Sequence, residues 1–206
     1  MTTPLMKPIA VALTGASGAQ YGLRLLQCLI EAGRDVQVMV SGPAQLVINM
    51  ETDLKLAGSA SQMERTLCEL TGAAAGQLVV YGKEQWTAPV ASGSNPPAAM
   101  AVCPCTTATL AAIATGASRS LIERAADVMI KERRPLVLVV REMPFSPIHL
   151  EHMLSLARIG VTIMPANPGF YNRPQRVGDL VDFVVARTLD HLGVEHRLVA
   201  RWGESP

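Results

Sequence analysis

The sequence predicts a doubly wound α/β fold, a flavodoxin-like or Rossmann-like three-layer sandwich with a parallel sheet. Short apolar runs alternate along the chain with segments of helical period, which is typical of parallel βαβ units. A Gly-rich turn joins the first apolar run to the first helical segment. The length of 206 residues suits one substantial core, so we expect a single domain over residues 1–206.

Six apolar runs are predicted as strands. In chain order they cover 9–13, 36–40, 78–81, 100–103, 136–140 and 161–164. The run 136–140 is apolar throughout, as a strand buried on both faces should be. The run 100–103 is predicted to end in a turn at Pro104.

Helical segments separate these strands. The first repeats leucine and isoleucine at helical spacing and ends at Gly33, a natural residue just past a helix end. A later helix begins with Ser146 as N-cap and Pro147 at the first helical position, and Gly160 ends it. The other predicted helices cover 44–50, 62–70, 107–114, 121–133 and 177–192, with loops at 86–97 and 167–175.

The composition excludes several classes of protein. Hydrophobic residues make up 49% of the chain and charged residues only 17%, which excludes a disordered protein. This much apolar surface predicts broad contacts between subunits of a homo-oligomer. The net charge of +1, without basic residues interleaved with aromatics, makes a nucleic-acid partner unexpected.

The apolar segments do not indicate a membrane or secreted protein. The run 9–13 is too short for a signal peptide, and Pro4 and Pro8 flank it. The apolar region 98–117 is interrupted by Pro104, so we assign it to the core. The four cysteines form no secreted framework, and we expect reduced thiols and a cytoplasmic protein.

The residues that directly follow the strands are candidates for ligand binding, because ligands bind at the carboxyl ends of an open parallel sheet. They combine hydroxyls, a cation and a carboxylate. In chain order they are Gly15, Ala16, Ser17, Gly18, Ser41, Cys105, Thr106, Thr107, Arg141, Glu142 and the loop with Tyr171. An arginine there can bind phosphate through two hydrogen bonds, and a neighbouring carboxyl can pass protons.

The turn from Thr14 to Gly18 suits a phosphate, because glycines allow close approach and the amides at a helix start favour an anion. It lacks the Lys-Ser/Thr ending of a Walker loop, which disfavours triphosphate hydrolysis. Ser41 ends the second strand where a dinucleotide site would have an acid for the ribose. A phosphate-bearing ligand other than NAD is therefore one interpretation, and a tight turn that merely needs glycine explains the motif about equally well.

Other reactive residues have plainer interpretations. The spacing of Cys103 and Cys105 matches neither a redox pair nor a zinc pair, so we expect buried thiols. His149 and His152 share a helical face without a third ligand, which indicates a solvated face and no metal site. Arg187 lies among apolar residues, so it either extends to solvent or meets an anion.

Eight segments spread over nearly the whole chain carry a family resemblance. They are 14–22, 51–53, 91–94, 124–128, 131–138, 168–171, 174–175 and 200–202. Together they closely resemble the UbiX-type flavin prenyltransferases of the flavin-binding decarboxylase superfamily. The Lys-Glu-Arg-Arg-Pro segment that begins at Lys131 and the Phe170-Tyr171 pair are specific to that family.

The resemblance implies an enzyme that joins the dimethylallyl group of dimethylallyl phosphate to N5 and then C6 of reduced FMN, without a metal. It implies a dodecamer, and prenylated FMN as a product for a UbiD-type decarboxylase, with ubiquinone biosynthesis as one pathway. FMN contacts carry over to Gly15, Ala16, Ser17, Ser41, Thr106, Thr107, Ala108, Thr109 and Arg141. Prenyl-phosphate contacts carry over to Lys131, Arg141, Glu142, Tyr171, Arg187 and Trp202. Thr106 departs from the family pattern, where serine is frequent.

The residue types fit this chemistry. Loss of phosphate from an allylic carbon needs cations and a proton donor at the leaving oxygens. We expect Glu142 and Ser17 to move protons, and Lys131 and Glu51 to belong to the catalytic site as well. Two alternatives are an FMN-dependent decarboxylase of the same superfamily and a flavin carrier without turnover.

Overall fold

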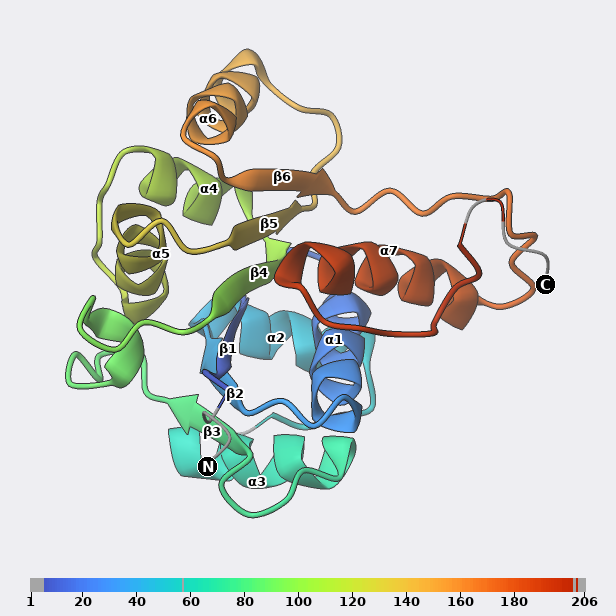
Figure 1. The fold of residues 1–206 in the computed structure, drawn as a ribbon, viewed down its shortest axis with the longest axis horizontal. Helices are drawn as coiled ribbons and strands as arrows, with labels where there is room; N and C mark the ends of the chain where they lie inside the picture. Colours follow the sequence, from blue (N-terminus) through green and yellow to red (C-terminus); the bar gives the residue numbers. More distant parts are fainter. Residues whose placement is uncertain (1–5, 57, 202, 204–206) are drawn as a thin grey trace, which may run out of the picture.

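In the computed structural model, which describes residues 6–56, 58–201 and 203, a six-stranded sheet forms the centre of the molecule (Figure 1). The strand order is β3-β2-β1-β4-β5-β6 and every neighbouring pair is parallel. The strands are β1 (Ile9–Leu13), β2 (Val36–Val40), β3 (Leu78–Tyr81), β4 (Ala99–Cys105), β5 (Leu136–Val140) and β6 (Thr162–Pro165). This confirms the predicted α/β class and the bounds of β1, β2, β3 and β5.

The helices that connect the strands are also close to the predicted segments. They are α1 (Ala19–Glu31), α2 (Gly42–Glu51), α3 (Ala60–Thr71), α4 (Thr107–Ala114), α5 (Leu121–Lys131), α6 (Pro147–Arg158) and α7 (Val177–Leu192), with a short 3₁₀ helix at Pro89–Ala91. The predicted continuation of α5 to residue 133 is wrong. Arg133 takes a left-handed conformation with φ of 52°, which ends the helix.

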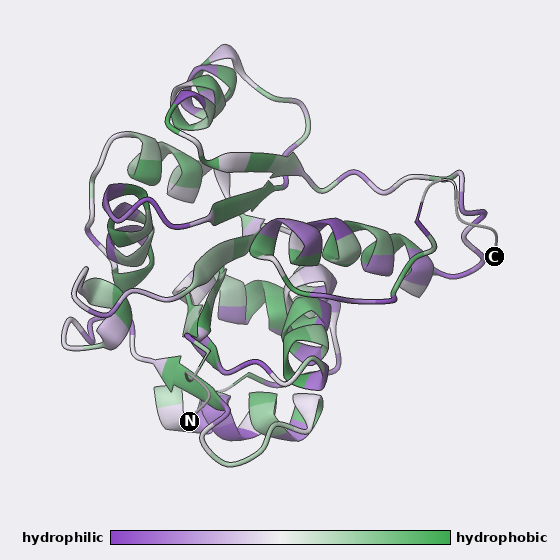
Figure 2. Ribbon diagram, in the orientation of Figure 1, coloured by the Kyte–Doolittle hydropathy of each residue, from purple (hydrophilic) through white to green (hydrophobic). Residues whose placement is uncertain are grey.

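The helices cover both faces of the sheet and give three layers. Helices α1, α2, α3 and α7 pack against one face, where Val11, Val38 and Val139 point. Helices α4, α5 and α6 pack against the other face, where Met100 and Leu138 point. Figure 2 shows the strands and the inner sides of the helices as hydrophobic, and the hydrophilic residues on the outer sides.

The strand β4 differs from the prediction, because it continues through Pro104 to Cys105 with a shift in register after Val102. Proline cannot donate to the sheet, but the Pro104 carbonyl accepts hydrogen bonds from the Thr14 amide at 3.2 Å and the Thr14 hydroxyl at 2.8 Å. The Thr14 hydroxyl oxygen in turn accepts from the Thr106 amide at 2.8 Å. These bonds join the carboxyl ends of β1 and β4, where the strand order changes direction.

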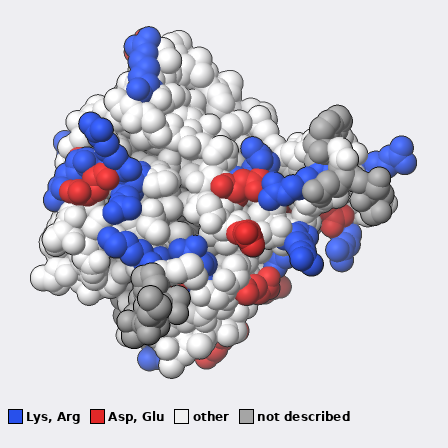
Figure 3. Space-filling view, in the orientation of Figure 1, with Lys and Arg blue, Asp and Glu red and all other residues white. Residues whose placement is uncertain are grey.

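Part of the surface is apolar. On α6 the side chains of Ile148, Leu150 and Leu154 are more than half exposed, and Ile159 just beyond the helix is 60% exposed. Figure 3 shows wide uncharged areas between clusters of charged side chains on one face. Among the helices of the described residues, none is long and apolar enough to cross a membrane.

Candidate functional site

A cavity of about 310 Å³ lies at the carboxyl end of β1, and we call it the first-turn cavity. The turn after β1, the end of α2, the residue after β5 and the first turns of α7 all contribute to it. Its lining residues are Ser17, Gly18, Gln20, Tyr21, Glu51, Arg141, Ala166, Val177 and Val181. Three of the predicted site residues, Ser17, Glu51 and Arg141, therefore lie in one cavity.

The carboxylate of Glu51 binds the start of α1. Its Oε2 accepts hydrogen bonds from the backbone amides of Gly18 at 2.8 Å and Ala19 at 2.9 Å. Burial acts to raise the pKa of Glu51, but hydrogen bonds from the Ser17 hydroxyl and these amides, with the charge of Arg141, outweigh it and lower the pKa. The amides expected to be free for a phosphate at Gly18 and Ala19 thus donate to a carboxylate of the same chain.

Glycine is required at the first turn for steric reasons. A Cβ on Gly15 would collide with Pro43 of α2, and Gly18 has a φ of 101° that other residues rarely adopt. The tight-turn interpretation of the motif is therefore correct for these two positions. The ligand interpretation is compatible with this requirement, because Ser17 of the same turn lines the first-turn cavity.

The residues after β5 meet those after β4. The Arg141 amide donates to the Cys105 carbonyl at 3.2 Å, which continues the pairing of the two strands. Glu142 Oε2 accepts a hydrogen bond from the Thr107 hydroxyl at 3.4 Å. Glu142 is half-buried and Arg141 is exposed, so both a proton-transfer group and a cation are accessible at this edge.

A second cavity, of about 260 Å³, lies between the starts of α2 and α5, and we call it the α2–α5 cavity. Ser41 and Thr109, both predicted FMN contacts, line it together with Gly42, Lys83 and others. The Ser41 hydroxyl caps α2 by accepting from the Ala44 amide at 3.1 Å. The Thr106 hydroxyl caps α4 in the same way, accepting from the Thr109 amide at 3.1 Å.

Tyr171 and Arg187 meet in a third cavity, of about 190 Å³, between α7 and the segment that follows it. The Arg187 guanidinium forms an ion pair with Asp190 at 2.6 Å, so Arg187 does meet an anion. The Tyr171 ring packs edge-on against Phe183, with centroids 5.6 Å apart.

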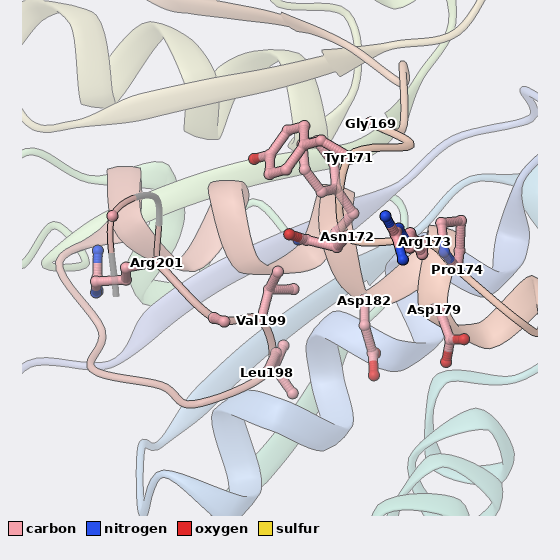
Figure 4. Close-up of a pocket in the computed structure, with 13 residues that line it drawn as sticks. Gly169, Tyr171, Asn172, Arg173, Pro174, Asp179, Asp182, Leu198, Val199 and Arg201 are labelled. Carbon is pink, nitrogen blue, oxygen red and sulfur yellow. The ribbon is translucent and has the colours of Figure 1, made fainter. Parts of the chain in front are cut away.

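An adjoining cavity of about 530 Å³ is lined by the loop before α7 and the segment after α7. Figure 4 shows Tyr171 and Asn172 from the loop on one side, and Leu198 and Val199 from the later segment on the other. In Figure 1 these two stretches project together from the side of the sheet. Trp202, predicted to contact the prenyl phosphate, lies outside the described residues.

The structure does not bring Lys131 to these cavities within one chain. Lys131 ends α5, residues 132–135 connect it to β5, and Arg141 follows the last residue of that strand. The strand β5 is about 17 Å long, so Lys131 lies toward the amino edge of the sheet and Arg141 lies at its carboxyl edge. Lys131 instead pairs with Glu132 beside Gly93. Within a single copy Lys131 therefore lines none of these cavities, and its contact with the prenyl phosphate stays a prediction.

The cysteines and histidines have structural roles. Cys103 and Cys105 are fully buried, as predicted, and burial raises the pKa of both thiols, that of Cys105 to about 12. His149 was predicted on a solvated face, but it belongs to the cap of α6: its Nδ1 accepts from the Ser146 amide at 3.2 Å. Within the described part of the chain, no three His, Cys, Asp or Glu side chains form a group that could hold a metal ion.

Three residues at these cavities were missed by the sequence analysis. Tyr21 lines the first-turn cavity, and burial raises its pKa. Lys83 lies two residues after the end of β3. Listing the residues that follow this strand, as was done for the other strands, would have included it. Asp190 forms an ion pair with Arg187, and the sequence could have predicted this pair, because residues three apart on a helix are neighbours on its surface.

Comparison with known proteins agrees with this arrangement. The chain matches the Flavoprotein family over residues 3–189. It is 59% identical to the flavin prenyltransferase UbiX of Pseudomonas aeruginosa over 196 residues, which cover 95% of this chain and 94% of that protein.

Two solved structures of similar sequence share the fold. A crystal structure of AnUbiX in complex with FMN and dimethylallyl pyrophosphate is 38% identical, with a TM-score of 0.85, and covers 98% of this chain and 100% of that one. A dodecameric FMN-dependent UbiX-like decarboxylase from Escherichia coli is 41% identical, with a TM-score of 0.83, and covers 96% of this chain and 100% of that one. With a relative 59% identical over nearly its full length, this chain belongs to the flavin prenyltransferase UbiX family.

Proposed function

We propose that this chain is a flavin prenyltransferase that transfers the dimethylallyl group of dimethylallyl phosphate to N5 and C6 of reduced FMN. The observation that carries the proposal is the first-turn cavity, in which Ser17, Glu51 and Arg141 converge in a chain of this family. The product, prenylated FMN, would serve a UbiD-type decarboxylase. The proposal treats residues 1–206 as one flavoprotein domain.

The donor set at the edge of the sheet fits FMN. The absence of a side chain at Gly15 lets the first turn pack on Pro43, and Ser17 of the same turn lines the first-turn cavity. Ser41 and Thr109 offer hydroxyls in the α2–α5 cavity, and the family pattern adds the neighbouring residues 106–108. When bound, the reduced flavin supplies the nucleophile, so the chain itself needs no nucleophilic side chain.

The chain's own residues bind the prenyl phosphate and move protons. Arg141 and Arg187 bear the positive charge that a leaving phosphate requires, and Tyr171 lies beside Arg187. Glu142, held by Thr107, is the proposed proton donor to the leaving oxygens. Ser17, which donates to the Glu51 carboxylate, is proposed to pass a proton at the flavin.

We also propose that the site is completed between subunits of a homo-oligomer, as a dodecamer. Within one copy Lys131 and Arg141 lie toward opposite edges of the sheet, on either side of β5, which is about 17 Å long, so Lys131 would act on the prenyl phosphate in a neighbour's site. The exposed apolar side chains of α6 support extensive contacts between copies. A cytoplasmic location is part of the proposal and agrees with the unpaired cysteines of the described chain.

The direct test is to incubate the protein with reduced FMN and dimethylallyl phosphate without oxygen and to measure the mass of the flavin. We expect a gain of one prenyl group. A flavin of unchanged mass would contradict the proposal. Two alternatives would then remain: an FMN-dependent decarboxylase, the activity in the name of one similar protein, and a flavin carrier without turnover. Glu142→Gln should bind FMN normally and form the product about 100-fold more slowly, within the range for general acid catalysis; an unchanged rate would remove Glu142 from the reaction.

A further inference from the structure

The α2–α5 cavity contains a cation to which no role has been given. Lys83 lies two residues beyond the end of β3, and it is the one lysine or arginine among the described residues that line this cavity. Its side chain is exposed, and it forms no ion pair or side-chain hydrogen bond within the described chain. Its charge is therefore available to a ligand.

The Lys83 ammonium lies over the first residue of α2. A Cβ placed on Gly42 would be 3.0 Å from Lys83 Nζ, so a glycine at this position leaves the space that the ammonium occupies. The backbone carbonyl of Lys83 also accepts a hydrogen bond from the Leu121 amide, the first residue of α5, at 3.4 Å. Lys83 thus lies between the starts of two helices.

This position is electrostatically unfavourable for a cation alone. The amino end of a helix carries a partial positive charge, so both α2 and α5 repel the Lys83 ammonium. An anion in the cavity would be attracted by the ammonium and by both helix ends. The acidic side chain in the lining, Glu123, is already engaged, because its Oε2 accepts from the Arg119 amide at 2.6 Å.

The cavity also has hydroxyl donors. The Ser41 oxygen accepts from the Ala44 amide at 3.1 Å, and the Ser120 oxygen accepts from the Glu123 amide at 3.3 Å. In each case the hydroxyl proton can still be donated to a ligand. An ammonium, hydroxyls and helix ends together are the groups that bind a phosphate.

The position of the α2–α5 cavity beside the first turn indicates which ligand the phosphate belongs to. Ser17 and Gly18 line the first-turn cavity, and Gly15 packs on Pro43 beside the start of α2, so one turn adjoins both cavities. The amides of Gly18 and Ala19 already donate to Glu51, so these two donors of the first turn are not available to a phosphate. We infer that Lys83 binds the phosphate of FMN in the α2–α5 cavity; the identity of the ligand rests on the proposed function.

The test compares the affinity of the protein for FMN and for riboflavin, which has no phosphate, by titration of flavin fluorescence at low salt. Lys83→Met should weaken FMN binding about five- to tenfold and leave riboflavin binding unchanged. Lys83→Arg should bind FMN within about twofold of the original protein. Lys55→Met removes the same charge from an exposed lysine outside the cavity and should change neither affinity.

Each outcome decides between specific explanations. An FMN affinity unaffected by Lys83→Met, or an equal loss for FMN and riboflavin, would overturn the role of Lys83 while leaving the prenyltransferase proposal intact. An equal loss of FMN affinity in Lys55→Met would mean that the effect of Lys83→Met comes from the net charge of the protein and not from a contact with the phosphate. If the original protein bound neither flavin, the proposed function would fail first, and the ligand assigned to Lys83 with it.

Discussion

The Oε2 atom of Glu51, at the end of α2, lies 2.8 Å from the backbone nitrogen of Gly18, at the start of α1. The carboxylate therefore acts as the cap of a helix to which it is not adjacent in sequence. Because the same side chain lines the first-turn cavity, one group links the stability of α1 to the candidate site. This relationship allows its structural and catalytic roles to be measured separately.

We expect Glu51→Gln to destabilise the protein by about 1 kcal/mol at pH 7, the usual effect of losing a helix cap. The pKa of Glu51 is lowered in the folded state, so its stabilisation is present above the unfolded pKa and is lost as the pH falls through the folded pKa. As the pH falls below about 4.5, the ordinary pKa of a glutamate, the original protein should therefore progressively lose this contribution, while the variant has none to lose. Denaturant unfolding at pH 7 and pH 4 measures both effects.

A constant difference in stability between the two proteins at both pH values would contradict the assignment of the ionised carboxylate as the cap. Glu31→Gln is a suitable control, because its exposed carboxylate is 3.8 Å from Arg24 and contributes little. Prenyl transfer measured at pH 7, where both proteins are folded, then reports any catalytic role of Glu51 alone.

The sequence was sufficient to predict most of the fold because the sheet is buried on both faces. A continuously apolar run of five residues such as 136–140 is typical of a strand buried on both faces, and the bounds of this strand are confirmed. The continuation of β4 through Pro104 could not be predicted, since proline usually ends a central strand. It depends on the Thr14 side chain, which is 90 residues away.

The candidate site was predicted less completely. Residues that directly follow strands, such as Ser17 and Arg141, meet because the carboxyl ends of parallel strands share an edge. Glu51 joins them through the packing of α2 on α1, which no local pattern encodes. The position of Lys131 could have been anticipated, because a helix that precedes a strand ends at the opposite edge of the sheet.

The ion pair between Arg187 and Asp190 makes a second prediction possible. Asp190 also contacts His196 and Arg201, each at 3.2 Å, so it holds Arg187 and the segment after α7 together. We expect Asp190→Asn to raise the KM for dimethylallyl phosphate about threefold, because Arg187 loses its fixed orientation while its charge remains. The Kd for FMN should stay the same. Steady-state kinetics with each substrate varied in turn provides the measurement.

Glu195→Gln is the matched control for this change. It removes a carboxylate from the same segment, and Glu195 has no hydrogen bond or ion pair with Arg187 among the described residues. A rise in KM in both variants, or an equal effect on FMN and the prenyl phosphate, would mean that Asp190 acts through general charge or folding.

Two helical glycines test the close packing of α1 on the sheet. A Cβ on Gly22 would collide with the carbonyl oxygen of Cys103 and lie 2.9 Å from Leu13 Cδ2, whereas Gly178 in α7 has nothing within 4 Å of that position. Gly22→Ala should destabilise the protein by about 1–3 kcal/mol through overpacking. Gly178→Ala should stabilise it by about 0.5–1 kcal/mol, because alanine favours the helix. Thermal and denaturant unfolding distinguish the two, and a stable Gly22→Ala protein would contradict the packing described.

The separation of Lys131 from Arg141 leads to a prediction about mixed oligomers. Lys131→Ala and Glu142→Gln should each be nearly inactive when every subunit carries the change. If a site takes Lys131 from one copy and Glu142 from another, some sites in a mixed oligomer receive both residues intact. Random mixing in equal amounts should restore about a quarter of the original activity, because each residue is intact with a probability of about one half.

A site formed within a single chain gives the opposite result. Every subunit in the mixture then lacks one of the two residues, so unfolding and reassembling the variants together should restore no activity. Co-expression of the two variants with different affinity tags, followed by purification on both tags, yields the mixed oligomer for this assay. Because β5, about 17 Å long, lies between Lys131 and Arg141 in one copy, we expect the mixed oligomer to regain activity.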